Sequence, residues 1–165
     1  MIIGVLKEPS PETRVSLLPE HITTLKKWNV EVLVETGAGI AAFAADEKYI
    51  GAGALIKSRN EVLQNSNLLL TINSPEKPEI INLNKKILLG IFQPLINTRV
   101  MQDFAENGLT VFSMDRLPRT TRAQSMDVLS SQANIAGYKA VLLAANLFPK
   151  YFPMFMTAAG SIPPA

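Results

Sequence analysis

The sequence contains no cysteine and a single histidine, His21, among its 165 residues. The absence of cysteine excludes disulfides, thiol chemistry and cysteine-ligated metals. With one histidine, we expect no histidine-based metal site or catalytic triad, and we predict no metal ligands. His21 itself is expected near the start of a helix or on its solvent side, without a catalytic role.

Long apolar runs and basic clusters are also absent. No uninterrupted apolar run approaches the roughly 18 residues of a membrane-spanning helix, and the first ten residues do not resemble a signal peptide. The net charge is only +2, with no basic run interleaved with aromatics, so neither nucleic-acid binding nor direct membrane insertion is predicted. The hydrophobic fraction of 47% is typical of a soluble globular protein, here expected in a reducing cytosol.

Short apolar runs alternate with helical patterns from residue 2 to residue 113. Strands are expected at 2–6, 30–35, 54–56, 67–72, 86–92 and 109–113, and helices at 20–28, 58–64 and 98–107, with a partial helix within 75–84. On the first helix, Ile22, Leu25 and Trp28 are expected to face inward. This rhythm predicts an α/β fold: a Rossmann-like, three-layer, doubly wound, mainly parallel sheet with helices on both faces.

Polar residues follow four of the predicted strands. They are Lys7-Glu8, Asn73-Ser74, Gln93-Pro94 and Met114–Arg116. Because the carboxyl ends of parallel strands meet at one edge of the sheet, and ligands of such sheets bind beyond that edge, we expect a ligand site there.

Residues 37–42 read Gly-Ala-Gly-Ile-Ala-Ala and match the spacing of a dinucleotide phosphate loop. That loop needs a helix directly after the glycines and an acidic residue at the end of the next strand. Lys57 and Ser58 follow the next predicted strand instead. A turn that uses glycine for its backbone freedom is therefore the favoured interpretation.

The stretch from Pro118 to Asn146 begins as a loop and is expected to become helical from about Gln124. At helical spacing, one sector carries only short polar side chains and Tyr138: Gln124, Asp127, Ser130, Ser131, Asn134 and Tyr138. Two interpretations stay open. This face either meets water or satisfied polar neighbours, or it forms the hydrogen-bonding wall of a ligand cleft.

Residues 119–141, RTTRAQSMDVLSSQANIAGYKAV, resemble the helix-initiating loop of the NAD-binding subunit of proton-translocating NAD(P) transhydrogenase. That domain is in turn similar to the N-terminal domain of alanine dehydrogenase. The segments Lys7-Glu8-Pro9 and Glu12-Thr13-Arg14-Val15, and the final MFMTAAGSIPPA, extend the resemblance over essentially the whole chain.

The resemblance implies a nicotinamide site at Arg119, Gln124, Asp127 and Ser130, with Gln124 and Asp127 as the catalytic residues. It implies NAD(H) as cofactor, NADP(H) on a partner subunit, a homodimer, and membrane proton-channel subunits that hold the protein at the cytoplasmic side of a bacterial inner membrane. It also implies a domain at residues 1–146, followed by an apolar connector at 147–165 that leads into a further NAD-binding Rossmann domain.

Two positions favour one of the two similar enzymes, transhydrogenase and alanine dehydrogenase, over the other. The positions that match the active-site lysine and histidine of alanine dehydrogenase are Asn73 and Gln93 here, while Arg14 matches the arginine that binds the substrate carboxylate there. An amide cannot act as a general acid near neutral pH, so transhydrogenase is favoured. An alanine dehydrogenase-type oxidoreductase domain and a non-catalytic dimerisation scaffold remain the alternatives.

Overall fold

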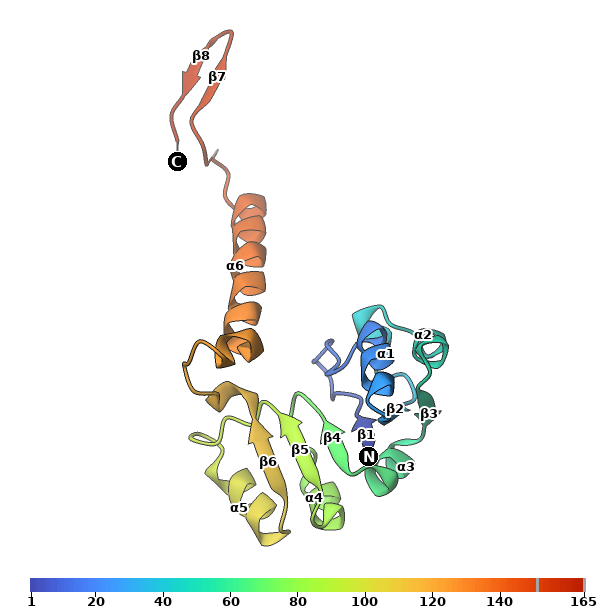
Figure 1. The fold of residues 1–165 in the computed structure, drawn as a ribbon. Coiled ribbons are helices and arrows are strands. Elements are labelled where there is room, and N and C mark those ends of the chain that lie inside the picture. Colours follow the sequence, from blue (N-terminus) through green and yellow to red (C-terminus); the bar gives the residue numbers. More distant parts are fainter. Residues whose placement is uncertain (151, 165) are drawn as a thin grey trace. The chain divides into compact units, whose positions relative to one another are not determined.

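The computed structural model describes residues 1–150 and 152–164, in two compact units, Met1–Arg119 and Thr120–Ala165. The first unit is built on a six-stranded sheet in the order β3-β2-β1-β4-β5-β6 (Figure 1). Its strands are β1 (Ile2–Val5), β2 (Glu31–Glu35), β3 (Leu55–Lys57), β4 (Leu68–Leu70), β5 (Ile87–Gly90) and β6 (Thr110–Ser113). Every neighbouring pair is parallel, which confirms the predicted α/β, Rossmann-like fold.

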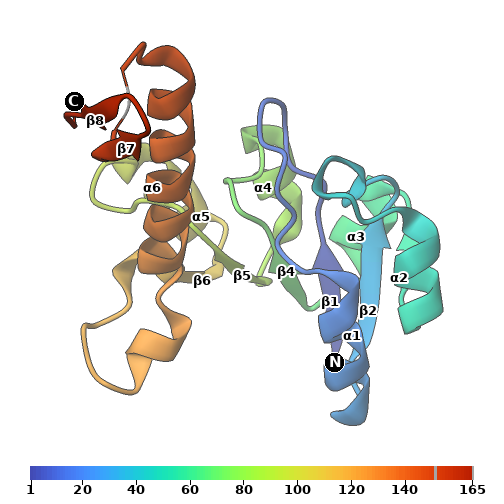
Figure 2. The ribbon, with the colours of Figure 1, turned by 90° about the horizontal axis from the view of Figure 1, so that it is seen from above.

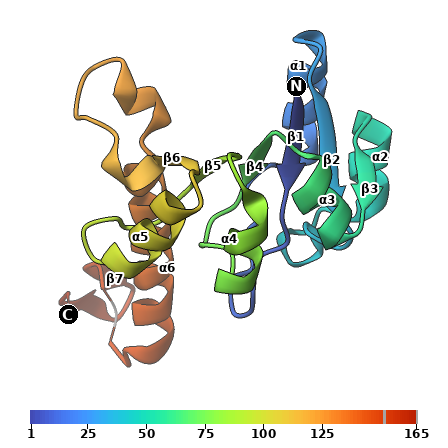
Figure 3. The same cartoon turned by 90° about the horizontal axis from the view of Figure 1, so that it is seen from below.

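Helices cover both faces of this sheet. They are α1 (Pro19–Lys27), α2 (Asp46–Ala52), α3 (Arg59–Asn65), α4 (Lys77–Leu83) and α5 (Thr98–Glu106). Ile22 of α1 and Tyr49 of α2 are buried in one apolar cluster, and Figure 2 shows these two helices beside β1 and β2. Val62, Ile80 and Phe104 of α3, α4 and α5 are buried in the other, and Figure 3 shows α4 between α3 and α5. The strands are therefore covered on two sides, as a parallel sheet requires.

Local sequence signals fix several of the helix ends. Pro19 opens α1, where its missing N–H costs nothing. Ser58 caps α3 in a reciprocal arrangement with Glu61. Gly108 follows α5 with a φ of +64°, the left-handed conformation that glycine adopts without a steric penalty. These three boundaries agree with the predicted ones to within two residues.

Three features of the first 119 residues and the final stretch differ from prediction. Trp28 was expected to face inward but is 70% exposed, because α1 ends at Lys27 and the helical spacing no longer applies to the capping residue. The short helix α2 was not predicted. The predicted connector contains a hairpin of β7 (Phe155–Thr157) and β8 (Gly160–Ile162), while Tyr151 lies outside the described residues.

The long helix of the second unit begins later than predicted. Residues Ala123–Met126 form a short 3-10 helix, Asp127 has an extended backbone, and α6 (Val128–Leu147) begins only after it. The predicted polar stripe was therefore wrong as a single helix face, because Gln124 and Asp127 precede the regular helix. No described helix is long and apolar enough to cross a membrane. The division predicted at residues 146 and 147 stays a prediction.

Candidate functional site

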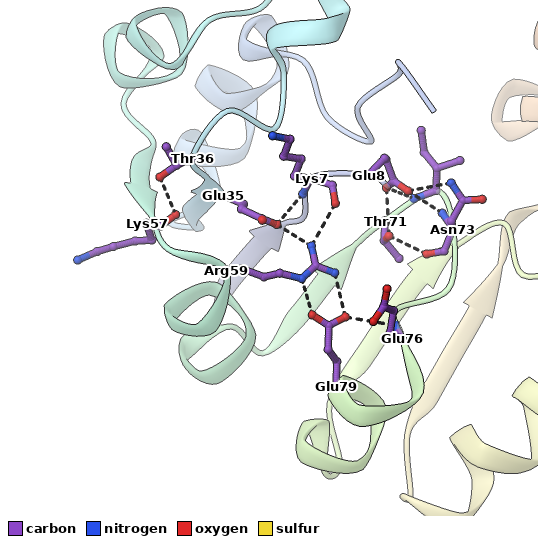
Figure 4. Close-up of polar contacts among 11 residues, drawn as sticks. Lys7, Glu8, Glu35, Thr36, Lys57, Arg59, Thr71, Asn73, Glu76 and Glu79 are labelled. Atoms are coloured by element: carbon purple, nitrogen blue, oxygen red, sulfur yellow. Dashed lines mark hydrogen bonds and ion pairs between the residues drawn. The ribbon is translucent and has the colours of Figure 1, made fainter. Parts of the chain in front are cut away.

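The carboxyl ends of the strands meet at one edge of the first unit. Strand order reverses between β1 and β4, the point at which open α/β sheets leave a crevice for ligands. A cavity of about 390 Å³ lies there, lined by polar side chains and two prolines. Figure 4 shows the hydrogen bonds among several of the polar side chains. Its lining residues are Lys7, Glu8, Pro9, Glu35, Arg59, Thr71, Asn73, Ser74, Pro75, Glu76 and Glu79. This cavity is hereafter the switch-point crevice.

Glu8 joins the two halves of the sheet across that crevice. Its side chain is 7% exposed and accepts hydrogen bonds from the residues that follow β4 (Figure 4). Oε1 accepts from the Ile72 amide at 2.6 Å and from Thr71 Oγ1 at 3.1 Å, and Oε2 accepts from the amide and the side-chain Nδ2 of Asn73 at 3.0 Å each. A buried carboxylate with so many donors is well satisfied, and it fixes the Asn73 side chain.

Arg59 forms a second connection from the start of α3. Its guanidinium donates to Glu35 at 2.8 Å, to the Lys7 carbonyl at 3.1 Å, and to both carboxylate oxygens of Glu79. The hydrogen bond from Arg59 lowers the pKa of Glu79. The bidentate geometry and the partial burial of all three side chains make this a stronger link than an exposed ion pair.

A smaller cavity, of about 210 Å³, contains Asn73 and Gln93, the two positions that are expected to distinguish transhydrogenase from alanine dehydrogenase. Arg14, Asn73, Gln93 and Asn97 line it, together with Ile72, Ser74, Ile91 and Phe92. Asn97 Nδ2 donates to the Phe92 carbonyl at 3.0 Å, and Asn73 Nδ2 donates to Glu8. Both amides are therefore anchored through nitrogen, which leaves their oxygens as acceptors. Within residues 1–150 and 152–164, the Gln93 side chain makes no hydrogen bond.

Arg14 is engaged by its neighbour Glu12. Arg14 Nε lies 2.9 Å from Glu12 Oε1, and Nη2 lies 2.6 Å from Oε2. These hydrogen bonds lower the pKa of Glu12 to about 2. The guanidinium at this cavity is thus largely neutralised by a carboxylate of its own loop.

The Gly-Ala-Gly segment after β2 is a turn, as the sequence favours. Gly37 has a φ of +73°, and its amide donates to the carboxylate of Asp46 at 2.9 and 3.1 Å. At Gly39, an added Cβ would lie 2.7 Å from the Tyr49 ring. Three residues of 3-10 helix follow the segment, in place of the long helix that a phosphate loop needs.

Asp127 and Ser130, two of the predicted site residues, lie together at the start of α6. Asp127 Oδ1 accepts from the amides of Leu129 and Ser130 at 3.0 Å each, so Asp127 is the N-cap of the helix. Asp127 Oδ2 accepts the Ser130 hydroxyl at 2.6 Å. Because a carboxylate can only accept, the single hydroxyl proton of Ser130 is committed to Asp127, and the free lone pair of Ser130 Oγ can only accept from a ligand.

Gln124 and Arg119 complete the predicted set. Gln124 lies in the 3-10 helix, and its carbonyl accepts the Asp127 amide at 3.2 Å. Its side chain is exposed and makes no hydrogen bond among the residues that the structure describes. Arg119 is the last residue of the first unit, while the other three belong to the second. The assembly of all four residues into one site stays a prediction.

Sequence reasoning missed the connections made by Glu8 and by Arg59, and the hydrogen bonds from Gly37 to Asp46. Glu8 was expected as a strand-end residue but not as a ligand of the β4 loop, and no role was expected for Arg59, Glu79 or Asp46. Gly37 and Asp46 are 9 residues apart within one connection, whereas the partners of Arg59 and Glu8 are 20 to 65 residues away and are brought together by the strand order. Among the described residues, no group of three histidine or acidic side chains could hold a metal ion.

Comparison with known proteins identifies the family. Residues 4–136 match the family model described as alanine dehydrogenase/PNT, N-terminal domain. The chain belongs to this family. It is 39% identical over 93% of its length to the NAD(P) transhydrogenase subunit alpha of Cereibacter sphaeroides, and 27% identical over 91% to the alanine dehydrogenase of Bacillus subtilis.

A solved structure extends this relationship. The transhydrogenase of Sinorhizobium meliloti is 40% identical and matches the whole chain with a TM-score of 0.91, while this chain covers 50% of that one. The chain spans 30% of the Cereibacter sphaeroides subunit and 39% of the Bacillus subtilis enzyme. It thus corresponds to the N-terminal domain of longer family members.

Proposed function

We propose that this chain is part of the NAD(H)-binding subunit of a Re/Si-specific, proton-translocating NAD(P) transhydrogenase. The whole enzyme passes a hydride between NADH and NADP⁺, and NADP(H) is bound by a partner subunit. The transfer is coupled to a membrane proton channel at the cytoplasmic side of a bacterial inner membrane. Within this assembly the domain supplies the wall of the cleft that faces the nicotinamide ring, through Arg119, Gln124, Asp127 and Ser130.

The observation that carries the proposal is the presence of Asn73 and Gln93 in the 210 Å³ cavity. Hydride transfer between two nicotinamides breaks one C–H bond and makes another, and no O–H or N–H bond changes. Ordered, water-poor placement of the reactants is then sufficient. Alanine dehydrogenase chemistry also moves protons, and neither amide can supply or remove one near neutral pH. The higher identity to transhydrogenases agrees with this choice.

The donor and acceptor pattern at the start of α6 suits a carboxamide. A carboxamide offers an NH₂ donor and a carbonyl acceptor. Ser130 Oγ, with its proton held by Asp127, accepts from the NH₂ group, and the free side chain of Gln124 can pair with either end. When bound, the nicotinamide supplies the hydride chemistry. The residues of this chain orient the ring, with Asp127 positioning Ser130 and capping the helix.

Asp127→Asn tests this arrangement in the full-length protein with its partner subunits. Asparagine is also a good N-cap, so α6 should keep its stability. The side-chain nitrogen would replace Oδ2 and donate to Ser130 Oγ, which would reverse the polarity that Ser130 presents to the ligand. We expect a fall in hydride-transfer rate of about tenfold or more, the equivalent of one lost or reversed hydrogen bond.

Ser125→Ala is the matched control, because the Ser125 hydroxyl donates to the Arg122 carbonyl at 3.0 Å, away from Ser130. It should transfer hydride at the wild-type rate. Gln124→Asn should behave like Asp127→Asn, because it shortens the side chain by one methylene. Wild-type rates in both Asp127→Asn and Gln124→Asn would remove these residues from the site.

We also propose that the subunit is a homodimer. In the structure, α6 has no buried residue, and Ile135, Leu142 and Leu143 are exposed by 55%, 47% and 59%. Large apolar side chains that are exposed together along one helix are typical of protein interfaces. Sedimentation of the full-length protein should give the mass of two subunits, and a monomer at micromolar concentration would contradict the proposal.

A further inference from the structure

Several strand ends at the carboxyl edge of the sheet carry an internal carboxylate on a backbone amide that the sheet leaves unpaired. After β5 this is the second such amide, because Phe92 N donates to Ser113 Oγ at 3.0 Å. The pairs are Lys7 N with Glu35 Oε2 at 2.8 Å, Gly37 N with Asp46 Oδ1 at 2.9 Å, Ile72 N with Glu8 Oε1 at 2.6 Å, and Gln93 N with Asp115 Oδ1 at 3.4 Å. Four loops, after β1, β2, β4 and β5, therefore share one feature that no local sequence motif explains.

This edge is where α/β sheets bind the phosphates of nucleotides, through backbone amides. The amides of Ile72 and Asn73 converge on one carboxylate, together with Asn73 Nδ2 and the Thr71 hydroxyl. Successive amides that converge in this way form an anion-binding arrangement. Here the anion is Glu8, a side chain of the same domain, and it is buried.

The charges that line the crevice also disfavour the binding of a phosphate. Four carboxylates and two basic side chains line the switch-point crevice. Arg59, a cation suited to a phosphate, already donates to Glu35, Glu79 and the Lys7 carbonyl. A volume of about 390 Å³ lies in the usual range of ligand sites, so space alone does not keep a phosphate group out.

We propose that Glu8 is an internal ligand that excludes phosphate-bearing ligands from the switch-point crevice, so that a dinucleotide meets this domain through its nicotinamide end. Glu8 is thereby a specificity-determining residue. The proposal rests on the proposed function only in naming a dinucleotide as the excluded ligand. The anion site that Glu8 occupies is formed by residues 71–73 of the same domain and does not depend on the function of the whole enzyme.

The test is anion rescue of Glu8→Ala in the full-length protein, with no nucleotide or partner subunit present. The substitution leaves two amides and Asn73 Nδ2 without their acceptor, while the Thr71 hydroxyl keeps the Asn73 carbonyl at 2.7 Å. We expect the melting temperature to fall by several degrees, and formate and inorganic phosphate each to restore it in a saturable manner, because a ligand that binds only the folded state stabilises it. Chloride at the same ionic strength should not restore it.

Glu31→Ala is the control, because Glu31 is exposed at the opposite end of β2. Formate and phosphate should shift its melting temperature no more than that of the wild type. If Glu8→Ala is unfolded in buffer, recovery of its secondary structure is titrated with the same anions. Absence of recovery in every anion would overturn the proposal.

Rescue by formate without rescue by phosphate would also overturn it, since something other than Glu8 would then keep phosphate out. The readout is independent of hydride transfer. Anion rescue together with no hydride transfer between NADH and NADP⁺ by the full-length protein and its partner subunits would leave Glu8 as an internal ligand and remove the proposed function. Hydride transfer without anion rescue would keep the proposed function and remove this role of Glu8.

Discussion

Replacement of Arg59 by methionine should destabilise the first unit more than removal of any exposed ion pair. Arg59 Nη1 donates to Glu35 at 2.8 Å, and Nε and Nη2 donate to Glu79. Methionine keeps much of the apolar stem but leaves Glu35 and Glu79, whose side chains are 12% and 21% exposed, without their cation.

The magnitude follows from the degree of burial. Breaking a fully buried pair costs about 3–5 kcal/mol because a charge is left uncompensated, whereas an exposed pair contributes about 0–1 kcal/mol. The Arg59 side chain is 32% exposed, so solvent screens part of its interaction with each carboxylate. We therefore expect a loss of about 2–3 kcal/mol in the free energy of unfolding at pH 7.

The loss should also depend on pH. The hydrogen bond from Arg59 lowers the pKa of Glu79 below its ordinary value of 4.5. A group with a lowered pKa in the folded state contributes stability that is present above the unfolded pKa and disappears as the pH falls through the folded one. The difference between wild type and Arg59→Met should thus be full at pH 7 and shrink below pH 4.5.

Urea unfolding followed by circular dichroism at a series of pH values measures this difference. Lys57→Met is the matched control, because Lys57 and Glu61 form an exposed ion pair at 3.3 Å, and its loss should be about 0.5 kcal/mol or less. A loss below about 0.5 kcal/mol for Arg59→Met, or a loss that does not change with pH, would refute the reasoning.

Two further predictions follow from the same structure. Gly39→Ala should destabilise the chain by about 1–3 kcal/mol, because the new Cβ would clash with the Ala44 carbonyl oxygen and lie 2.7 Å from the Tyr49 ring. Gly51→Ala in α2, whose new Cβ meets no atom within 4 Å, should stabilise it by about 0.5–1 kcal/mol. Equal effects of the two substitutions in thermal unfolding would contradict the packing. Isothermal titration should show very weak binding of NADH to the 165-residue chain alone, because internal carboxylates occupy the amides of Gly37 and Ile72; low-micromolar affinity would contradict this expectation.

The strands and most helices were predictable because their signals are local. Buried parallel strands appear in a sequence as continuous apolar runs, and β4 (Leu68–Leu70) and β5 (Ile87–Gly90) are two examples. The helix α2 was missed because it has seven residues, a single buried one, Tyr49, and no side-chain cap, whereas the equally short α3 is marked by its cap Ser58. The interruption at Asp127 was missed because a helical wheel assumes a regular helix, whereas Asp127 uses its carboxylate to cap one.

The candidate site was predictable only in part. Convergence of Glu8, Asn73 and Gln93 at one edge followed from the parallel arrangement alone. Their hydrogen bonds did not, since Glu8 reaches Asn73 only because β1 lies beside β4, a neighbour some 65 residues away. The commitment of the Ser130 proton to Asp127 depends on a distance of 2.6 Å that no spacing in the sequence encodes.

The most direct test of the central claim is an assay of the full-length protein in two mixtures. One contains NADH, pyruvate and ammonium. The other contains the NADP(H)-binding partner subunit, NADPH and an oxidised NAD analogue. We predict turnover only in the second mixture, as expected for hydride transfer without a proton donor at Asn73 or Gln93. Turnover only in the first would mean that alanine dehydrogenase chemistry proceeds without the lysine and histidine, and would contradict the transhydrogenase function proposed for this chain.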